Sequence, residues 1–257
     1  MEGKVAIVTG SAAGIGAATA ELLASRGARV VVNYSQSADE AAAVHAACER
    51  HGAEAVLVQA DVAVDGDCRR LAQAALDRWG RIDWLVNNAG VTAFAAHGDL
   101  DALRADDFQR IYAVNVIGSF QMIRACAGSM REHGEGAVVN VSSLAGVAGI
   151  GSSVAYAASK GALNTLTIDL ARALAPAIRV NAVCPGFVET RWWRNRLGDA
   201  YEEQRDRFAA MTPLGKTVTP QETAEAVAYL LTAEKLTGET LMLDAGLHLN
   251  FAPLAAR

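Results

Sequence analysis

The sequence predicts one α/β domain, in which helices cover both faces of a doubly wound parallel sheet of about seven strands. Short apolar, β-branched runs alternate along the whole chain with longer alanine-rich segments of helical period. The short runs are mostly continuously apolar, as parallel strands buried on both faces are. No repeat, linker or charge run divides the chain, so we expect a single domain over 1–257.

The expected strands and helices follow one another in a regular order. Strands are expected at 5–8 (VAIV), 30–32 (VVV), 55–58 (AVLV), 82–86 (IDWLV), 137–141 (AVVNV), 178–183 (IRVNAV) and 240–243 (TLML). Helices are expected between them at 15–28, 37–51, 65–79, 105–132, 154–175 and 219–232. The last helix has the clearest start, because Thr219, Pro220 and Glu222 make a capping box with proline at the first helical position. This alternation implies right-handed crossovers.

Composition narrows the class of partner. The formal net charge is -5 and the pI is near 5.6, which argues against nucleic acid or an anionic membrane as a partner and favours a small molecule. No apolar stretch reaches the ~18 residues of a membrane span. Met1 to Lys4 lead directly into an apolar run without a signal peptide, and the four cysteines are widely scattered, so we expect a cytoplasmic protein.

A glycine pattern follows the first strand and opens the first helix. Gly10 permits a tight turn, Gly14 lets backbone approach a pyrophosphate, and Gly16 lets the helix pack closely on the strand. The helix N-terminus then offers free N–H groups to the phosphates. This context predicts a dinucleotide site on a Rossmann-type sheet, and a glycine-rich turn without a ligand is the alternative.

Tyr156 and Lys160 stand four residues apart on a predicted helix, so they share one face. A nearby ammonium favours phenolate and is expected to lower the pKa of the tyrosine toward neutrality. Tyr156 is therefore the candidate general acid and base. Ser143 and Ser142 end the strand at 137–141, and only one of them can face a site at this edge, where its hydroxyl would steady a substrate oxygen.

Together, several motifs resemble the short-chain dehydrogenase/reductase family, and in particular its ketoreductases. They are the G-x-x-x-G-x-G spacing, Asn87-Asn88-Ala89-Gly90, Asn115, Ser143, Tyr156-x-x-x-Lys160 and Pro185-Gly186. The resemblance spans the chain and implies hydride transfer between NAD(P)(H) and a carbonyl/alcohol pair. A cofactor-binding sensor without turnover is the alternative, although such proteins usually lose the Tyr or the Lys. An enoyl reductase or an epimerase on the same fold is a third reading.

The resemblance also implies roles for individual residues. It selects Ser143 over Ser142, gives Lys160 the nicotinamide ribose, and places Asn115 on a water-linked proton path to that lysine. An Asn115 that only bonds backbone within a helix is the alternative. Asp61 would meet the adenine amino group, or be an ordinary loop residue. The expected cofactor-binding residues are Gly10, Ser11, Ala13, Gly14, Ile15, Gly16, Asn33, Tyr34, Ser35, Asp61, Val62, Asn88, Ala89, Gly90, Tyr156, Lys160, Pro185, Gly186, Val188 and Thr190.

The end of the second strand bears on the choice of cofactor. Asn33, Tyr34 and Ser35 stand there in place of the acidic residue that would repel a 2′-phosphate, so NADP(H) is favoured and NAD(H) is the alternative. Many NADP-preferring relatives carry a cation where this chain has Ala13. The resemblance also implies a homotetramer, with interfaces formed by the helices at 105–132 and 154–175.

The segment 187–216 lacks strand-helix regularity and follows the ligand edge of the sheet, so we expect a substrate lid there. Trp192, Trp193 and Phe208 would cover the substrate, or the tryptophan pair would pack against the body. No metal is predicted, because the His45, Cys48 and His51 group lacks a fourth ligand.

Overall fold

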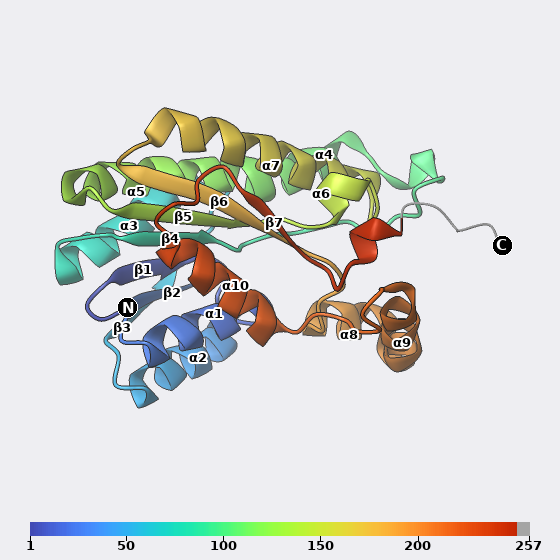
Figure 1. Ribbon diagram of the computed structural model, residues 1–257, viewed down its shortest axis with the longest axis horizontal. Coiled ribbons are helices and arrows are strands. Elements are labelled where there is room, and N and C mark those ends of the chain that lie inside the picture. Colours follow the sequence, from blue (N-terminus) through green and yellow to red (C-terminus); the bar gives the residue numbers. More distant parts are fainter. Residues whose placement is uncertain (251–257) are drawn as a thin grey trace.

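A computed structural model of the protein describes residues 1–250 and contains one seven-stranded sheet, all of whose strand pairs are parallel (Figure 1). The strands are β1 (Val5–Val8), β2 (Arg29–Tyr34), β3 (Ala55–Gln59), β4 (Trp84–Asn87), β5 (Gly136–Val141), β6 (Ile178–Pro185) and β7 (Thr240–Leu243). Their order is β3-β2-β1-β4-β5-β6-β7. This confirms the predicted doubly wound fold. The order reverses between β1 and β4, so a ligand is expected to bind at the carboxyl ends of these two strands.

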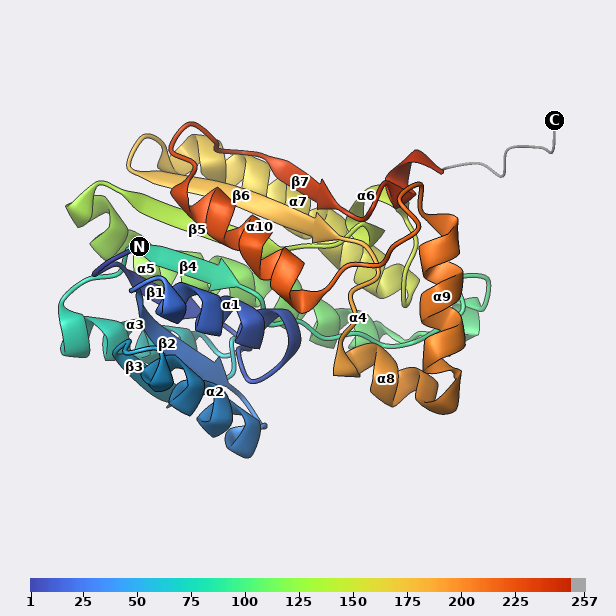
Figure 2. The same ribbon diagram turned by 60° about the horizontal axis from the view of Figure 1, so that its bottom comes forward.

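Helices cover both faces of the sheet. The α-helices are α1 (Gly14–Ser25), α2 (Ala38–Arg50), α3 (Asp65–Trp79), α4 (Ala105–Tyr112), α5 (Ser119–His133), α6 (Ala145–Ala148), α7 (Val154–Leu174), α8 (Arg191–Leu197), α9 (Tyr201–Met211) and α10 (Pro220–Thr232). Short 3-10 turns are η1 (Leu100–Ala102), η3 (Gly198–Ala200) and η4 (Leu247–Leu249), and η2 (Ala113–Gly118) is a π-helix. In Figure 2, α1, α2 and α10 lie in front of the sheet and α3, α5 and α7 behind it.

Each strand contributes to two apolar layers. On β1, Ala6 and Val8 pack with α1, α2 and α10, whereas Val5 and Ile7 pack with α3 and α5. Because successive side chains point to opposite faces, a strand covered on both sides must be apolar at every position. This is why the strand sequences are continuous apolar runs.

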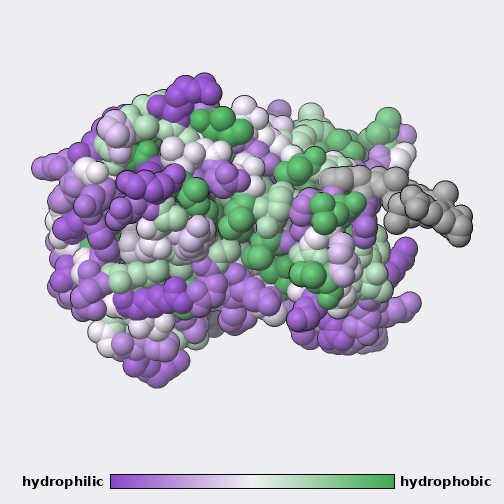
Figure 3. Space-filling view, viewed as in Figure 1, coloured by the Kyte–Doolittle hydropathy of each residue, from purple (hydrophilic) through white to green (hydrophobic). Residues whose placement is uncertain are grey.

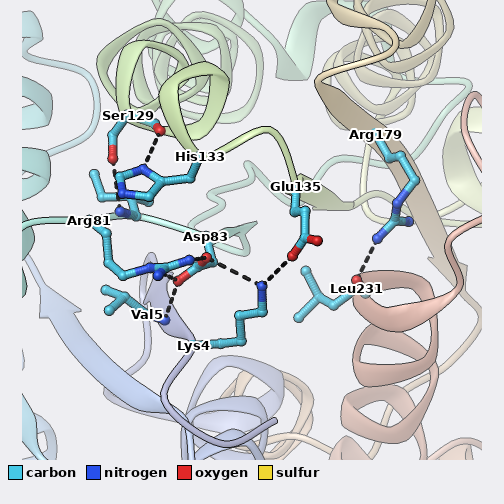
Figure 4. Close-up of polar contacts among 10 residues, drawn as sticks. Lys4, Val5, Arg81, Asp83, Ser129, His133, Glu135, Arg179 and Leu231 are labelled. Carbon is cyan, nitrogen blue, oxygen red and sulfur yellow. Dashed lines mark hydrogen bonds and ion pairs between the residues drawn. The ribbon is translucent and has the colours of Figure 1, made fainter.

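Polar contacts hold the amino-terminal edge of the sheet together (Figure 4). The Asp83 carboxylate is 1% exposed and accepts hydrogen bonds from the Val5 amide at 2.8 Å and from Arg81 Nε at 2.9 Å. Burial raises the pKa of Asp83, but these hydrogen bonds outweigh it, so the pKa lies below its usual value. Arg179 donates to carbonyls at the end of α10, among them those of Leu230 and Leu231. These groups lie at the edge opposite to the carboxyl edge. The ligand site is expected at the carboxyl edge, so they do not take part in it.

Two stretches differ from the sequence prediction. The segment expected as one helix at 105–132 is divided by the π-helix η2, and α5 continues to His133. The segment 187–216 is largely helical, since it contains α8 and α9. Tyr201 is the one buried residue of these two helices, so they lack the apolar stripe by which helices are recognised in a sequence.

Candidate active site

A cleft of about 970 Å³ opens at the carboxyl edge of the sheet, between the ends of β1, β4, β5 and β6 and the helices α8 and α9. In the space-filling view, apolar residues border the hollow between these two helices and the rest of the molecule (Figure 3). Most of the predicted site residues line this cleft. They are Gly10, Ala13, Gly14, Ile15, Asn33, Ser35, Asp61, Val62, Asn88, Ala89, Gly90, Ser143, Tyr156, Lys160, Pro185, Gly186, Val188 and Thr190.

The glycine-rich turn has the shape of a phosphate cradle. Gly10 has a φ of +61°, and a Cβ on it would lie 2.9 Å from the Cα of Ala89, so only glycine fits. Ala13 is the N-cap residue of α1 and provides no side-chain cap. The first N–H groups of α1 therefore remain open toward the cleft, where the helix dipole favours an anion. These residues fit the pyrophosphate of a dinucleotide.

Three predicted cofactor residues do not line the cleft. Ser11 is fully buried, and its hydroxyl donates to the Val8 carbonyl at 2.8 Å. A Cβ on Gly16 would lie 2.4 Å from Asn88 Nδ2, so Gly16 permits close packing. Tyr34 packs against the apolar core. Asn33 does line the cleft, but its amide already accepts from the Gly10 N–H at 2.9 Å and donates to the Ala60 carbonyl at 3.1 Å.

The ends of β5 and α7 bring Ser143, Tyr156 and Lys160 together. Ser153 caps α7, and its hydroxyl accepts a hydrogen bond from the Tyr156 N–H at 3.2 Å. Lys160 Nζ donates to the Val141 carbonyl at 2.7 Å and lies 5.7 Å from the centre of the Tyr156 ring. The Ser143 side chain lies near enough to Tyr156 to lower its pKa, and Ser143 Oγ accepts a hydrogen bond from the Ala145 N–H at 3.1 Å. These three groups converge at one end of the cleft.

Ser142 differs from Ser143 in where its hydroxyl is used. Both serines border the cleft, but the Ser142 hydroxyl donates to the Lys160 carbonyl at 3.3 Å and the residue is buried. The Ser142 hydroxyl proton is therefore used on α7, whereas Ser143 Oγ only accepts, from the Ala145 N–H at 3.1 Å, and can still donate its own proton. The geometry favours Ser143 for contact with a bound oxygen.

Burial, rather than neighbouring charge, is the main cause of the shifted pKa values of Tyr156 and Lys160. Burial raises the pKa of Tyr156 to about 12, and the nearby Ser143 side chain only partly opposes the rise. Burial also lowers the pKa of Lys160 to about 8. The expectation that Lys160 lowers the pKa of the phenol was wrong, because the Lys160 ammonium is directed to the Val141 carbonyl and the effect of burial on Tyr156 dominates. Tyr156 is thus protonated at neutral pH and ready to donate.

Comparison with known proteins places this geometry in a family. The family model described as enoyl-(acyl carrier protein) reductase matches residues 10–248. The "Granaticin polyketide synthase putative ketoacyl reductase 2" of Streptomyces violaceoruber is 42% identical over 96% of this chain and 97% of its own. A 3-oxoacyl-(acyl-carrier-protein) reductase of Synechocystis is 36% identical over 95% of this chain and 96% of its own. A crystal structure titled as a "putative short-chain dehydrogenase/reductase from Burkholderia xenovorans" is 41% identical, with a TM-score of 0.90 and coverage of 97% and 100%.

The chain belongs to the short-chain dehydrogenase/reductase family. It is an NAD(P)-dependent oxidoreductase that acts on carbonyl and alcohol substrates, and it resembles the ketoreductases of the family. None of these similarities supports the alternative of a sensor without turnover. In residues 1–250, no helix is long and apolar enough to span a bilayer, and no three His, Cys, Asp or Glu side chains are grouped to hold a metal ion.

Asn115 lies behind the site of this dehydrogenase/reductase. It is buried in the π-helix η2, where its Oδ1 accepts from the Val91 N–H at 2.9 Å and its Nδ2 donates to the Val91 carbonyl at 3.0 Å and to Ser159 Oγ at 3.0 Å. A Cβ on Gly90 would lie 3.5 Å from Asn115 Oδ1 and 3.8 Å from Lys160 Nζ. Asn115 therefore fixes the loop after β4 beside the lysine, and its side chain does not line the cleft.

The two tryptophans of α8 have different surroundings. Trp193 stacks on Phe187 with 5.1 Å between ring centres, and Phe187 stacks on Phe208 at 4.7 Å. Trp192 is 39% exposed and meets the Tyr156 ring edge-on, with 5.9 Å between centres and 86° between planes. Both tryptophans line the cleft, but the Trp193 ring is covered by a stacked ring, whereas Trp192 forms part of the cleft wall beside Tyr156 with no ring stacked on it.

Several residues that line the cleft were not predicted from the sequence. Phe94 follows the Asn87–Gly90 motif, Arg110 comes from α4, and Leu247 comes from the C-terminal turn η4. Met211 ends α9 and Gln36 follows β2. The position of Phe94 directly after a motif at the ligand edge was the one available signal, because the others arrive through packing of distant elements.

Proposed function

We propose that this short-chain dehydrogenase/reductase reduces ketones with NADPH, using Tyr156 as the proton donor. The observation that carries the proposal is that Ser143, Tyr156 and Lys160 line the same end of the cleft, where burial keeps the Tyr156 hydroxyl protonated. A phenol that stays protonated at neutral pH suits donation to a developing alkoxide better than abstraction from an alcohol. Carbonyl reduction is therefore the favoured direction.

The chain's own residues account for the proton transfer and the orientation. The Ser143 hydroxyl would hold the substrate oxygen, and the Tyr156 hydroxyl would give it a proton. The Lys160 ammonium, held by the Val141 carbonyl, would stabilise the resulting phenolate and bind the nicotinamide ribose. When bound, the nicotinamide supplies the hydride. Asn115 is a positioning residue that keeps the Val91 loop beside Lys160 and so supports the water-linked path to it.

The residues at the adenosine end of the cleft support a preference for NADP(H) over NAD(H). Ser35 and Gln36 line the cleft after β2, where a carboxylate would be needed to reject a 2′-phosphate. Arg191 lines the same cleft and forms an ion pair with Glu40 of α2. Both side chains are nearly half exposed, so this pair is weak and the arginine can turn to a phosphate. Arg191 thus supplies the cation that is missing at Ala13.

The test of this function is a comparison of kcat/KM for NADPH and NADH on a panel of ketones, with an enoyl thioester included. We expect ketone reduction with a preference for NADPH of about tenfold or more, since charge-assisted contacts to a phosphate are strong. Arg191→Met should reduce the preference, and binding of adenosine 2′,5′-bisphosphate should weaken in parallel. A preference for NADH, or turnover of the enoyl thioester alone, would contradict the proposal.

We further propose a homotetramer in the cytoplasm. Phe108, Ile117 and Phe120 on the α4 to α5 segment, and Val154 and Ile168 on α7, are large apolar side chains at the surface. Such side chains are typical of subunit interfaces. The four cysteines are free and buried, as suits a reducing compartment. Light scattering at working concentrations should give the mass of four chains, and a monomer would refute the assembly.

The segment 187–216 is proposed as the substrate lid. It supplies the cleft residues Thr190, Trp192 and Phe208, and its two helices lie beyond one end of the sheet rather than against one of its faces (Figure 2). Closure over a ligand would exclude water from the site. Hydrogen exchange of α8 and α9 should slow when cofactor and substrate are added, and exchange that does not change would argue for a fixed wall.

A further inference from the structure

The indole of Trp192 is the least covered aromatic ring in this wall of the cleft. The rings nearest to it, those of Tyr156 and Phe94, meet it edge-on at 86° and 78°. No ring of the described residues 1–250 stacks on it. Its neighbour Trp193 has the Phe187 ring stacked on it at an angle of 24°. Trp192 therefore keeps aromatic surface available to a ligand.

The position of Trp192 relates this surface to the reacting group. Its ring centre lies 5.9 Å from that of Tyr156, whose hydroxyl meets Ser143. A carbonyl that reaches these two hydroxyls would place one of its substituents beside the indole. Ile150 and Met211 line the same cleft and are both more than two-fifths exposed, so they add apolar surface to it.

We propose that Trp192 binds a flat aromatic ring next to the reacting carbonyl, so that the enzyme prefers fused-ring aromatic ketones to saturated ones of equal size. This inference rests on the ketone reductase activity proposed above. An aromatic ring gains from contact with another ring beyond its buried area, whereas a saturated ring gains only the burial. The three-ring stack of Trp193, Phe187 and Phe208 ties α8 to α9, so the indole of Trp192 has a defined place within the segment 187–216.

The experiment compares β-tetralone with β-decalone, because in both ketones the carbonyl is unconjugated and the ring system has the same size. We expect the wild type to favour β-tetralone in kcat/KM by about two- to tenfold. Trp192→Leu should remove this preference, and Trp192→Phe should keep most of it because a ring remains. Trp79→Leu is the matched control, because Trp79 ends α3, packs against the core and does not line the cleft; it should lower the melting temperature and leave the preference unchanged.

A binding measurement separates this inference from the proposed reaction. β-Naphthol and β-decalol are titrated calorimetrically into the wild type and Trp192→Leu, with tighter binding of β-naphthol expected in the wild type only. If the wild type reduces neither ketone but shows this difference in binding, the proposed reaction fails and the inference stands. If Trp192→Leu keeps the wild-type preference in rate and in binding, or if the wild type shows none, the inference is overturned.

Discussion

Replacing Tyr156 by phenylalanine removes one oxygen atom from the proposed proton donor. The contacts with Trp192 and with Lys160 Nζ involve the ring, and the Ser153 cap involves the backbone N–H, so all three remain. The fold loses at most the contact between the hydroxyl and the Ser143 side chain, so stability should fall by no more than about 1 kcal/mol. The reaction loses its general acid, which is worth about 10²- to 10⁴-fold in rate. Activity should therefore fall far more than stability.

The assay measures NADPH oxidation with a ketone, NADPH affinity by fluorescence, and the melting temperature. Tyr201→Phe is the matched control, because the buried Tyr201 hydroxyl forms no hydrogen bond among the described residues. We expect Tyr201→Phe to keep its activity and Tyr156→Phe to lose at least about a hundredfold with unchanged NADPH affinity. If Tyr156→Phe instead retained turnover within a few-fold of the wild type, the assignment of the proton donor would be wrong.

Three further perturbations test other parts of the argument. Ser143→Ala should lower kcat/KM by about a hundredfold and Ser142→Ala by only a few-fold, because only the first hydroxyl meets Tyr156; the reverse order in steady-state kinetics would move the role to Ser142. Burial lowers the pKa of Lys160 to about 8, so the rate of reduction should fall as pH rises through that value and the ammonium is lost; a pH–rate profile flat to pH 10 would contradict this. Asp83→Asn should cost about 2 kcal/mol of unfolding free energy in urea titrations, since Arg81 and the Val5 amide lose an ionised acceptor. Because the pKa of Asp83 is lowered in the folded state, that cost should be complete above about pH 4 and shrink as pH falls through the lowered pKa; a cost independent of pH would show that charge is not its origin.

The periodic pattern of apolar residues was enough to predict the sheet. The inner strands β1, β2, β4, β5 and β6 are buried on both faces, so their sequences are mostly apolar, and this leaves a local signal. The capping box at Thr219 is equally local: Glu222 N–H donates to Thr219 Oγ1 at 3.1 Å, as expected. Helices α8 and α9 lack such a signal, because they expose most of their surface and pack chiefly through aromatic side chains.

In the candidate site, too, some features were predictable from the sequence and others were not. The glycine spacing and the pair Tyr156 and Lys160 depend on residues near in sequence, so the sequence alone determined them. Burial depends on what distant elements place around a group, and only the tertiary structure decided the pKa of Tyr156. It likewise decided that the Trp193 ring is covered by stacking while the ring of the adjacent Trp192 is left open, since the folding of the segment 187–216 brings Phe187 against Trp193 and Phe208 against Phe187.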